Sequence, residues 1–366
     1  MSRRATFGIV GAYGATGKAV VAELLKSTGD AILVGGRDSA KLAACAAEFG
    51  SRVSPLTTDI LDPRSLDAFC RECSVVINCG GPVAQLQDHV AQSALRERCH
   101  YVDPAGMGVV KERIAPLEQE ILDHRLSFVV SAGWSPGITE LLPVYAHSRM
   151  DSADSVEVYF ADSGEWSDSA LRDGVAHLRS VGIAKPGYFR KGKWVQAKTS
   201  EASRKVDVGS PIGLRRFSLF YLPEQSEVGR RLSGCDFRCY AYLAGARNAL
   251  DAMMIALLPL SEASAMRRLR NIFRRNRVGV GGFVIVRLRG RSQGRSAVSR
   301  FSITFDSGRD YWIHGVTLAT VAGLISRGPG VRPGVHFLSE AVEPALLMQE
   351  LRKAGVRYSE TEESGP

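Results

Sequence analysis

A glycine-rich stretch near the N-terminus constrains the fold of this chain more than any other feature. Phe7-Gly-Ile-Val10 predicts a short buried strand, Gly11-Ala-Tyr-Gly-Ala-Thr-Gly17 a tight loop, and the residues after it a helix. This order places backbone N–H groups and the positive end of a helix dipole where they bind a diphosphate. The spacing G-x-x-G-x-x-G is a variant used by dinucleotide folds. We therefore expect a dinucleotide to contact Gly11, Tyr13, Gly14, Ala15, Thr16 and Gly17.

Apolar runs and helical patterns alternate through the first part of the chain. This alternation is typical of a parallel sheet with helices on both faces, so residues 1–148 are predicted to form an α/β, doubly wound Rossmann domain. The predicted strands are Thr6–Val10, Ala31–Gly35, Val53–Thr57, Val75–Asn78, His100–Asp103 and Ser127–Ser131.

Strand-like segments dominate the second part. Ser155–Phe160, Gly279–Arg289 and Val298–Asp306 predict a mainly antiparallel sheet with a few helices, an α+β substrate domain over residues 149–315. Residues 316–358 are predicted to be a helical segment that packs back toward the Rossmann domain. Residues 359–366 form a polar tail that we expect to be disordered.

The end of the second predicted strand, Gly35-Gly36-Arg37-Asp38, indicates which dinucleotide is bound. An acidic residue there would accept hydrogen bonds from the ribose of NAD. Gly36 replaces that acid, and the Arg37 guanidinium suits a 2′-phosphate. We therefore expect NADP(H), with Asp38 capping the next helix.

Two further loops are candidates for the same site. Asp59 either contributes to the adenine pocket or caps its own turn, and the sequence leaves both roles open. Glycines after the fourth strand allow backbone to approach the nicotinamide half, and the proline is expected to open a helix at its first position. The residues of this loop are Cys79, Gly80, Gly81 and Pro82.

Composition narrows the class of protein. The net charge is +9, yet no helix-turn-helix, zinc-finger or RNA-binding signature accompanies it, so an anionic cofactor and an acidic protein partner are expected rather than nucleic acid. Seven cysteines, an odd number, indicate reduced thiols. The pairs Cys70/Cys73 and Cys235/Cys239 are predicted to be packing residues, and no metal site is expected. No apolar run of about 18 residues and no signal peptide are found, which predicts a cytoplasmic protein without membrane contact.

Four motifs in order resemble the saccharopine dehydrogenase superfamily: the loop 11–17, Val76-Ile-Asn-Cys-Gly-Gly-Pro82, His100-Tyr-Val-Asp-Pro-Ala-Gly106 and Ala132-Gly-Trp-Ser-Pro-Gly-Ile138. The segment Gly334–Pro344 resembles the C-terminal segment of bacterial members. Within the superfamily, the chain looks most similar to thiazolinyl imine reductases of siderophore pathways, the enantio-pyochelin type. The resemblance implies hydride transfer from NADPH to a C=N bond. A saccharopine-type C–N dehydrogenase, a trans-acting enoyl reductase and a regulatory protein that senses NADP without turnover remain alternatives.

Imine reduction needs a proton donor beside the hydride acceptor. Asp103, at the carboxyl end of the fifth strand, is the first candidate, with Tyr101 and His314 behind it. Residues 101 and 103 lie on one side of a strand. For each, a capping or packing role is the competing interpretation. Trp134, Tyr159, Trp166 and Tyr188 suit a flat heteroaromatic substrate, although such residues are also common in cores.

The segment Met266–Arg277 predicts an amphipathic helix with Leu269, Ile272 and Phe273 on one face and arginines on the other. It is either an ordinary surface helix or the docking site of an acidic carrier protein of a peptide synthetase that presents a tethered substrate. A homodimer is also left open.

Overall fold

A computed structural model of the chain describes residues 5–181 and 186–364. The chain divides into two compact units, and each contains more than one stretch of sequence. Among the described residues, the first unit comprises 5–138 and 311–355, and the second comprises 139–181, 186–310 and 356–364. The first boundary lies ten residues before the predicted one, because helix α8 (Ile138–His147) belongs to the second unit. The predicted C-terminal segment 316–358 falls in the first unit as far as Gly355.

The first unit is built on a sheet of seven parallel strands in the order β15-β6-β5-β4-β1-β2-β3. The order reverses between β1 and β4, as in doubly wound dinucleotide-binding folds. Both Ile9 and Val10 are buried, and successive strand residues point to opposite faces, so both faces of the sheet are covered. The strands are β1 (Ala5–Val10), β2 (Ile32–Gly36), β3 (Val53–Thr57), β4 (Cys73–Asn78), β5 (His100–Val102), β6 (Ser127–Val130) and β15 (Gly334–Phe337).

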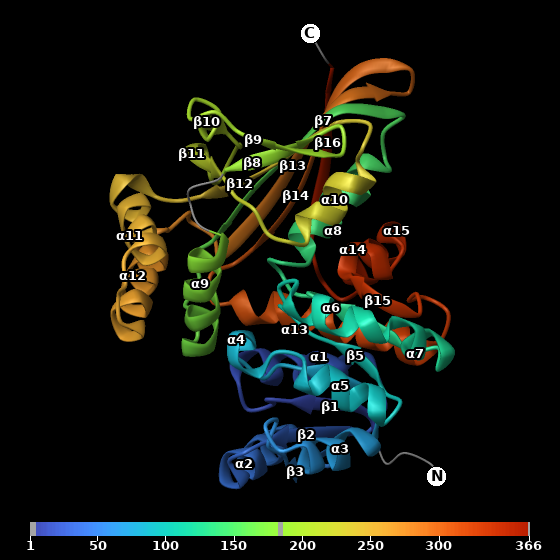
Figure 1. The fold of residues 1–366 in the computed structure, drawn as a ribbon. Helices are drawn as coiled ribbons and strands as arrows, with labels where there is room; N and C mark the ends of the chain where they lie inside the picture. Colours follow the sequence, from blue (N-terminus) through green and yellow to red (C-terminus); the bar gives the residue numbers. More distant parts are fainter. Residues whose placement is uncertain (1–4, 182–185, 365–366) are drawn as a thin grey trace. The chain divides into compact units, whose positions relative to one another are not determined.

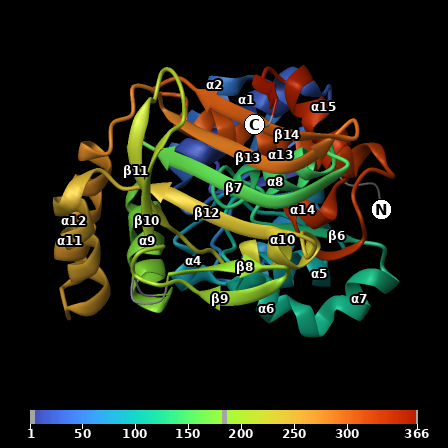
Figure 2. The ribbon, with the colours of Figure 1, turned by 90° about the horizontal axis from the view of Figure 1, so that it is seen from above.

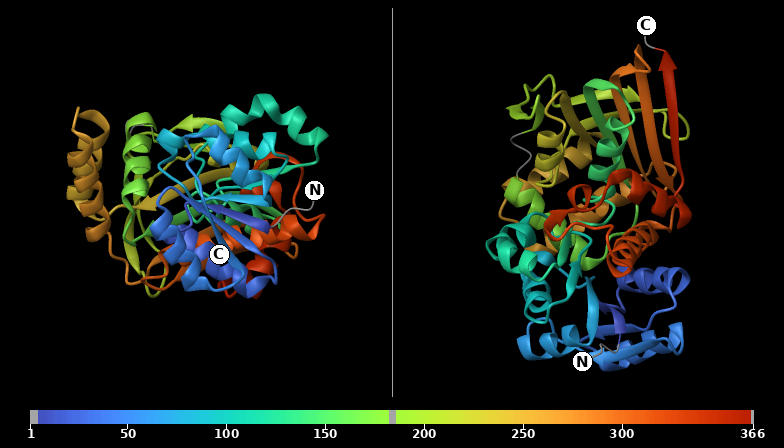
Figure 3. Two further views of the ribbon diagram at one scale, coloured as in Figure 1. Left: turned by 90° about the horizontal axis from the view of Figure 1, so that it is seen from below. Right: turned by 90° about the vertical axis from the view of Figure 1, so that its right-hand side faces the viewer.

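Helices connect these strands and cover the sheet (Figures 1 and 3). Side chains of α3, α5, α6 and α7 form one apolar core with strand residues such as Val76 and Phe128. The helices are α1 (Ala15–Ser27), α2 (Ser39–Phe49), α3 (Pro63–Arg71), α4 (Val83–Leu86), α5 (His89–Arg96), α6 (Val109–Ile114), α7 (Glu118–Asp123), α13 (Asp310–Arg327), α14 (Leu338–Ala341) and α15 (Pro344–Lys353).

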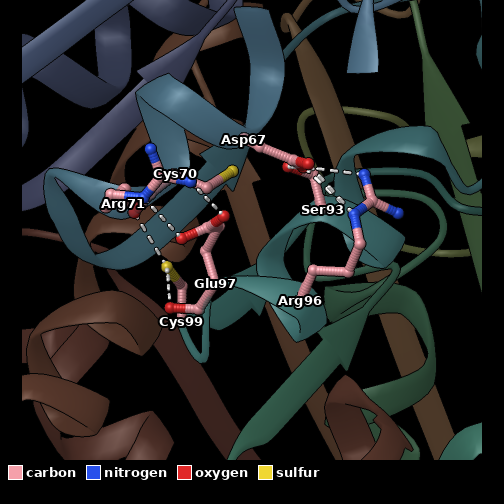
Figure 4. A network of polar contacts seen from close by, with 7 residues as sticks. All are labelled: Asp67, Cys70, Arg71, Ser93, Arg96, Glu97 and Cys99. Carbon is pink, nitrogen blue, oxygen red and sulfur yellow. Dashed lines mark hydrogen bonds and ion pairs between the residues drawn. The ribbon is translucent and has the colours of Figure 1, made fainter. Parts of the chain in front are cut away.

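A polar network joins α3 to α5 and the residues that follow it (Figure 4). Asp67 accepts hydrogen bonds from Ser93 and Arg96 at 2.6 and 2.7 Å, and Arg71 pairs with Glu97 at 2.7 Å; Sγ of Cys99 donates to the Cys70 carbonyl at 2.9 Å. Burial raises the pKa of the Cys70 thiol to about 12, so it is protonated at neutral pH. Cys70 and Cys73 are therefore packing residues, as predicted.

The second unit contains a mixed sheet. Its main path runs β10-β11-β12-β7-β13-β14-β16, and the hairpin β8–β9 attaches to β12. Among the described strands of this second sheet, only the β12–β7 pair is parallel, which agrees with the mainly antiparallel sheet that the sequence predicts. The strands are β7 (Ser152–Asp162), β8 (Gly187–Arg190), β9 (Lys193–Gln196), β10 (Ser203–Asp207), β11 (Leu214–Leu219), β12 (Asp236–Tyr242), β13 (Gly282–Ser292), β14 (Arg295–Phe305) and β16 (Tyr358–Ser364).

Three helices of this unit pack together beside the mixed sheet: α9 (Asp168–Val181), α11 (Gly245–Leu257) and α12 (Glu262–Arg275) (Figure 2). Their shared core includes Leu269 and Ile272, with Phe273 packed against it. The predicted amphipathic helix is thus confirmed as α12. A further helix, α10, spans Gln225–Arg231.

The prediction of a disordered tail is wrong for the residues that the structure describes. Residues Tyr358–Ser364 form β16, which pairs in antiparallel fashion with β14. The Tyr358 ring packs edge-on against Tyr145, and the two hydroxyl groups lie 3.3 Å apart. The polar sequence is explained by the edge position of the strand, since β16 has a sheet neighbour on one side only. None of the helices described in this structure is long and apolar enough to span a bilayer.

Candidate dinucleotide site

The glycine loop and the loop after β4 meet where the order of the parallel strands reverses. Gly11 has φ of +77°, and a Cβ on it would lie within 2.8 Å of the backbone of Cys79 and Gly80. The Cys79 amide donates to the Val10 carbonyl at 2.8 Å, which fixes the two loops side by side. This is the crevice in which open α/β sheets bind dinucleotides, so the structure brings the two predicted loops together.

The first turn of α1 presents free amide groups at this crevice. Gly14 is the N-cap residue, and no side chain caps the helix. Gly14 and Ala15 are exposed, and Gly17 is buried so closely against Gly11 that a Cβ would lie 2.5 Å from the Gly11 carbonyl oxygen. An uncapped, exposed helix N-terminus fits an anionic diphosphate.

The end of β2 differs from that of an NAD-binding domain in a specific way. The Tyr13 ring lies directly against Gly36 and occupies the space that a side chain at residue 36 would need. Arg37 follows and is exposed, with no hydrogen bond or ion pair to the described part of the chain. Asp38 caps α2 through a 3.0 Å hydrogen bond from the Lys41 amide, as predicted. The free guanidinium of Arg37 therefore fits a 2′-phosphate, which the sequence also predicts.

The two remaining loop predictions have different outcomes. Asp59 caps its own turn, because its Oδ1 accepts from the Leu61 amide at 3.0 Å, and the adenine-pocket role stays a prediction. Ile60, next to it, contacts Gly80. Pro82 is the N-cap of α4 rather than its first helical residue, because its ψ of 145° is extended. Gly81 directly precedes Pro82 in the loop after β4.

Asp103 stands just after β5 and is almost fully buried. Its Oδ1 accepts a hydrogen bond from the Ser131 amide at 3.1 Å, while Oδ2 is buried without a partner of good geometry among the described residues. Burial raises the pKa of Asp103 to about 6, and the Ser131 amide and the Tyr101 hydroxyl offset part of this effect. A carboxyl group with this pKa can hold a proton near neutral pH.

Tyr101 and Asn78 extend this polar group toward the glycine crevice. The Asn78 amide nitrogen lies 3.4 Å from the Tyr101 hydroxyl, and its oxygen accepts from the Gly80 amide at 3.0 Å. Burial raises the pKa of Tyr101 well above its usual value, and nearby Asp103 adds to the effect. The structure therefore brings Tyr101 and Asp103 together, as predicted. Asn78 was missed as a site residue, although its place at the carboxyl end of β4 is a usable signal.

His314 has a different environment. It lies on α13, and its Nδ1 accepts a hydrogen bond from the Trp134 amide at 3.3 Å. Gly133 is packed against the ring, since a Cβ there would lie 2.7 Å from Nδ1. Burial lowers the pKa of His314 to about 4, so the ring is neutral at physiological pH. The described contacts give His314 a packing role that holds the loop after β6, and its catalytic role stays a prediction.

The four aromatic residues expected near a substrate are packing residues in their own units. Trp134, Tyr159 and Tyr188 are at most 2% exposed. Trp166 stacks on Phe273 with ring centroids 4.0 Å apart. Large aromatic side chains commonly fill cores, and this explains their burial better than contact with a ligand.

Residues 7–135 match the family described as the saccharopine dehydrogenase NADP binding domain. Residues 7–135 are thus similar to a nicotinamide-dinucleotide-binding domain of the saccharopine dehydrogenase type, and NADP(H) is the cofactor that fits such a domain.

Two kinds of similarity extend this result. A probable mitochondrial saccharopine dehydrogenase-like oxidoreductase from Arabidopsis thaliana is 31% identical over 138 residues, which span 34% of this chain and 30% of that relative. The apo saccharopine dehydrogenase (L-Glu forming) of Saccharomyces cerevisiae has a similar fold, with a TM-score of 0.69 over 98% of this chain and all of that one, at 14% identity. A probable dehydrogenase from Thermotoga maritima aligns over 97% of this chain and 98% of its own, with a TM-score of 0.50 at 10% identity. These structural similarities confirm the α/β fold with its second, mixed sheet.

Proposed function

We propose that the protein is an NADPH-dependent reductase that transfers hydride to a C=N bond, with a thiazolinyl imine tethered to a carrier protein in siderophore biosynthesis as its substrate. The observation that carries the proposal is the buried Asp103 carboxyl, with a pKa of about 6, at the strand ends that also hold the dinucleotide loops. The motif resemblance noted in the sequence supports the choice of substrate.

When bound, NADPH would supply the hydride that the imine carbon needs. The chain itself must then provide a proton for the imine nitrogen, so that C=N becomes CH–NH. Asp103 holds that proton in its neutral form, and the Tyr101 hydroxyl and the Ser131 amide orient the carboxyl group. Asn78 fixes the Gly80 amide and thereby the loop beside the carboxyl group. Positioned acids of this kind contribute about 10²–10⁴-fold to rate.

The test compares NADPH oxidation with a thiazolinyl thioester, an enoyl thioester and the 2-oxoglutarate–lysine pair. We expect turnover of the first only, and a loss of at least 100-fold in kcat for Asp103→Asn with unchanged NADPH affinity. Asp62→Asn, which removes an exposed carboxylate that caps α3, is the matched control. Turnover of the second or third substrate instead would identify an enoyl reductase or a saccharopine-type dehydrogenase. NADPH binding without any turnover would favour the sensing protein.

The carrier part of the proposal concerns α12, and the structure changes which arginines test it. Arg268 and Arg270 pair with Asp251 and Asp168 at 2.6 and 2.7 Å, so reversing their charge would disturb the unit itself. Arg267 and Arg274 have no carboxylate partner in the described chain. We expect Arg267→Glu with Arg274→Glu to lower kcat/KM at least fivefold for the carrier-bound substrate and to leave a free thioester analogue unaffected. Equal effects on both substrates would exclude carrier docking at α12.

A further inference from the structure

Helix α11 of the second unit carries an exposed apolar face. Among the large apolar residues that are well exposed in the described chain, four of nine lie within residues 250–258. They are Leu250, Met253 and Leu257 on α11 and Leu258 directly after it, at 51%, 43%, 62% and 44% exposure. Soluble chains rarely gather such residues on one helix unless something covers them. The other five are scattered over different elements of both units.

The opposite face of α11 packs against other helices of the second unit. Ala252 and Ile255 are buried in the core shared with α9 and α12. Asp251, on the edge toward α12, binds Arg268 and Arg275 at 2.6 and 2.5 Å. The apolar face is therefore a second, independent surface of the helix, and its side chains are exposed in the described chain.

The spacing of this face is that of a helix-pairing seam. Ala246, Leu250, Met253 and Leu257 recur at intervals of 4, 3 and 4 residues, the pattern by which one helix packs its side chains into another. Apolar residues scattered over a surface without a partner helix are not expected to recur at this interval.

We infer that α11 pairs with α11 of a second copy of this chain, antiparallel and around a twofold axis between Leu250 and Met253. This register places the small Ala246 opposite the large Leu257 of the partner at both ends, and Leu250 opposite Met253 in the middle. The size of each side chain is therefore matched across the pair. A closed twofold contact uses the same face on both copies, so it needs no second surface.

Charge favours the same arrangement over a contact with an acidic partner. Arg247 is the only charged residue on the exposed part of α11, because Asp251 is committed to its two arginines. In the antiparallel register Arg247 lies beside the last turn of the partner helix, where carbonyl groups carry partial negative charge. No like charges meet along the seam itself. The inference does not depend on the proposed enzymatic function.

The test is the molar mass of the full chain in solution, measured by light scattering and sedimentation over a range of concentrations. We expect twice the mass of one chain, and we expect Leu257→Glu to raise the dimer dissociation constant at least tenfold. Leu214→Glu, which changes an equally exposed leucine on β11, is the matched control and should leave the dimer intact. Circular dichroism and thermal unfolding of each variant will show that the fold is preserved.

A second variant tests the register. Ala246→Lys combined with Leu257→Glu should restore the dimer, because the antiparallel pairing sets the new lysine opposite the new glutamate twice. A monomeric wild-type chain at 100 µM would overturn the inference, as would a dimer that Leu257→Glu leaves unchanged or that the double variant does not restore. A monomer that sediments with vesicles containing phosphatidylglycerol through this same face would show that it binds lipid instead.

Discussion

The aromatic ring of Tyr13 lies against Gly36, at the end of the second strand of the parallel sheet. This contact closes the position from which NAD-binding domains extend a carboxylate toward the ribose. Arg37, the residue after Gly36, is exposed and is the charged residue closest to Gly36 in the sequence. We propose that selection of the phosphorylated cofactor rests on a tyrosine that leaves no room for an acid at residue 36 as well as on an arginine that attracts a phosphate.

Arg37→Ala should raise the Kd for NADPH at least tenfold and the Kd for NADH less than twofold. A hydrogen bond between charged groups contributes about 1.5–3 kcal/mol, and only NADPH has the 2′-phosphate that would lose it. Titration calorimetry with both cofactors measures the difference. Arg64→Ala, at an exposed position on α3, is the control. Equal losses for the two cofactors would remove Arg37 from the selective contact.

Asp103 should make the stability of the protein depend on pH in a definite direction. Its folded pKa of about 6 lies above the ordinary value of 3.8, so between these values the folded chain holds a proton that the unfolded chain has released. This contribution is complete below pH 3.8 and is lost as the pH rises through 6. Urea unfolding at pH 4.5 and 7.5 should therefore show the stability of Asp103→Asn relative to the wild type rising by about 2 kcal/mol from the lower to the higher pH. A difference that does not vary with pH would show that the carboxyl group is ionised throughout.

Asp251→Ala should destabilise the second unit by about 1–3 kcal/mol, because two arginines of α12 lose their shared, largely buried partner. Asp168→Ala removes one carboxylate that is 72% exposed and pairs only with Arg270, so we expect a change below about 1 kcal/mol. Thermal unfolding of both variants provides the comparison. If the two variants unfold alike, the Asp251 pairs contribute no more than a surface contact.

Removal of residues 357–366 should lower the melting temperature and promote aggregation. The deletion takes away β16 and leaves β14 as an unpaired edge, which is a template for pairing with other chains. Tyr145 also loses the ring of Tyr358. Light scattering during heating detects the aggregation, and removal of residues 365–366 alone is the control. An unchanged melting curve for the longer deletion would mean that β16 adds nothing to the sheet.

The sequence predicts the first six strands of the parallel sheet well, because each is an apolar run bounded by turn residues. The seventh, β15, was missed since it has only four residues and joins β6 from about 200 residues further along the chain. The strands β8 to β11 are also short and are partly exposed. They therefore lack a clear alternating pattern in the sequence.

At the site, glycine spacing predicts the crevice, and the position of Asp103 after a buried strand predicts its burial. The partners of individual side chains cannot be found in this way. Nothing local to Tyr13 indicates that its ring covers Gly36, and nothing local to α12 indicates that Arg268 and Arg270 already have carboxylate partners on other helices.

The parallel sheet includes β15, which is encoded more than 300 residues after β1. During synthesis on the ribosome, the outer edge of β6 therefore stays unpaired until residue 337 has emerged and β15 can form. The second unit likewise needs β16 from the end of the chain. A premature stop anywhere before residue 334 leaves both sheets incomplete, so truncated chains from this gene are expected to be captured by chaperones or degraded rather than to survive as half-molecules.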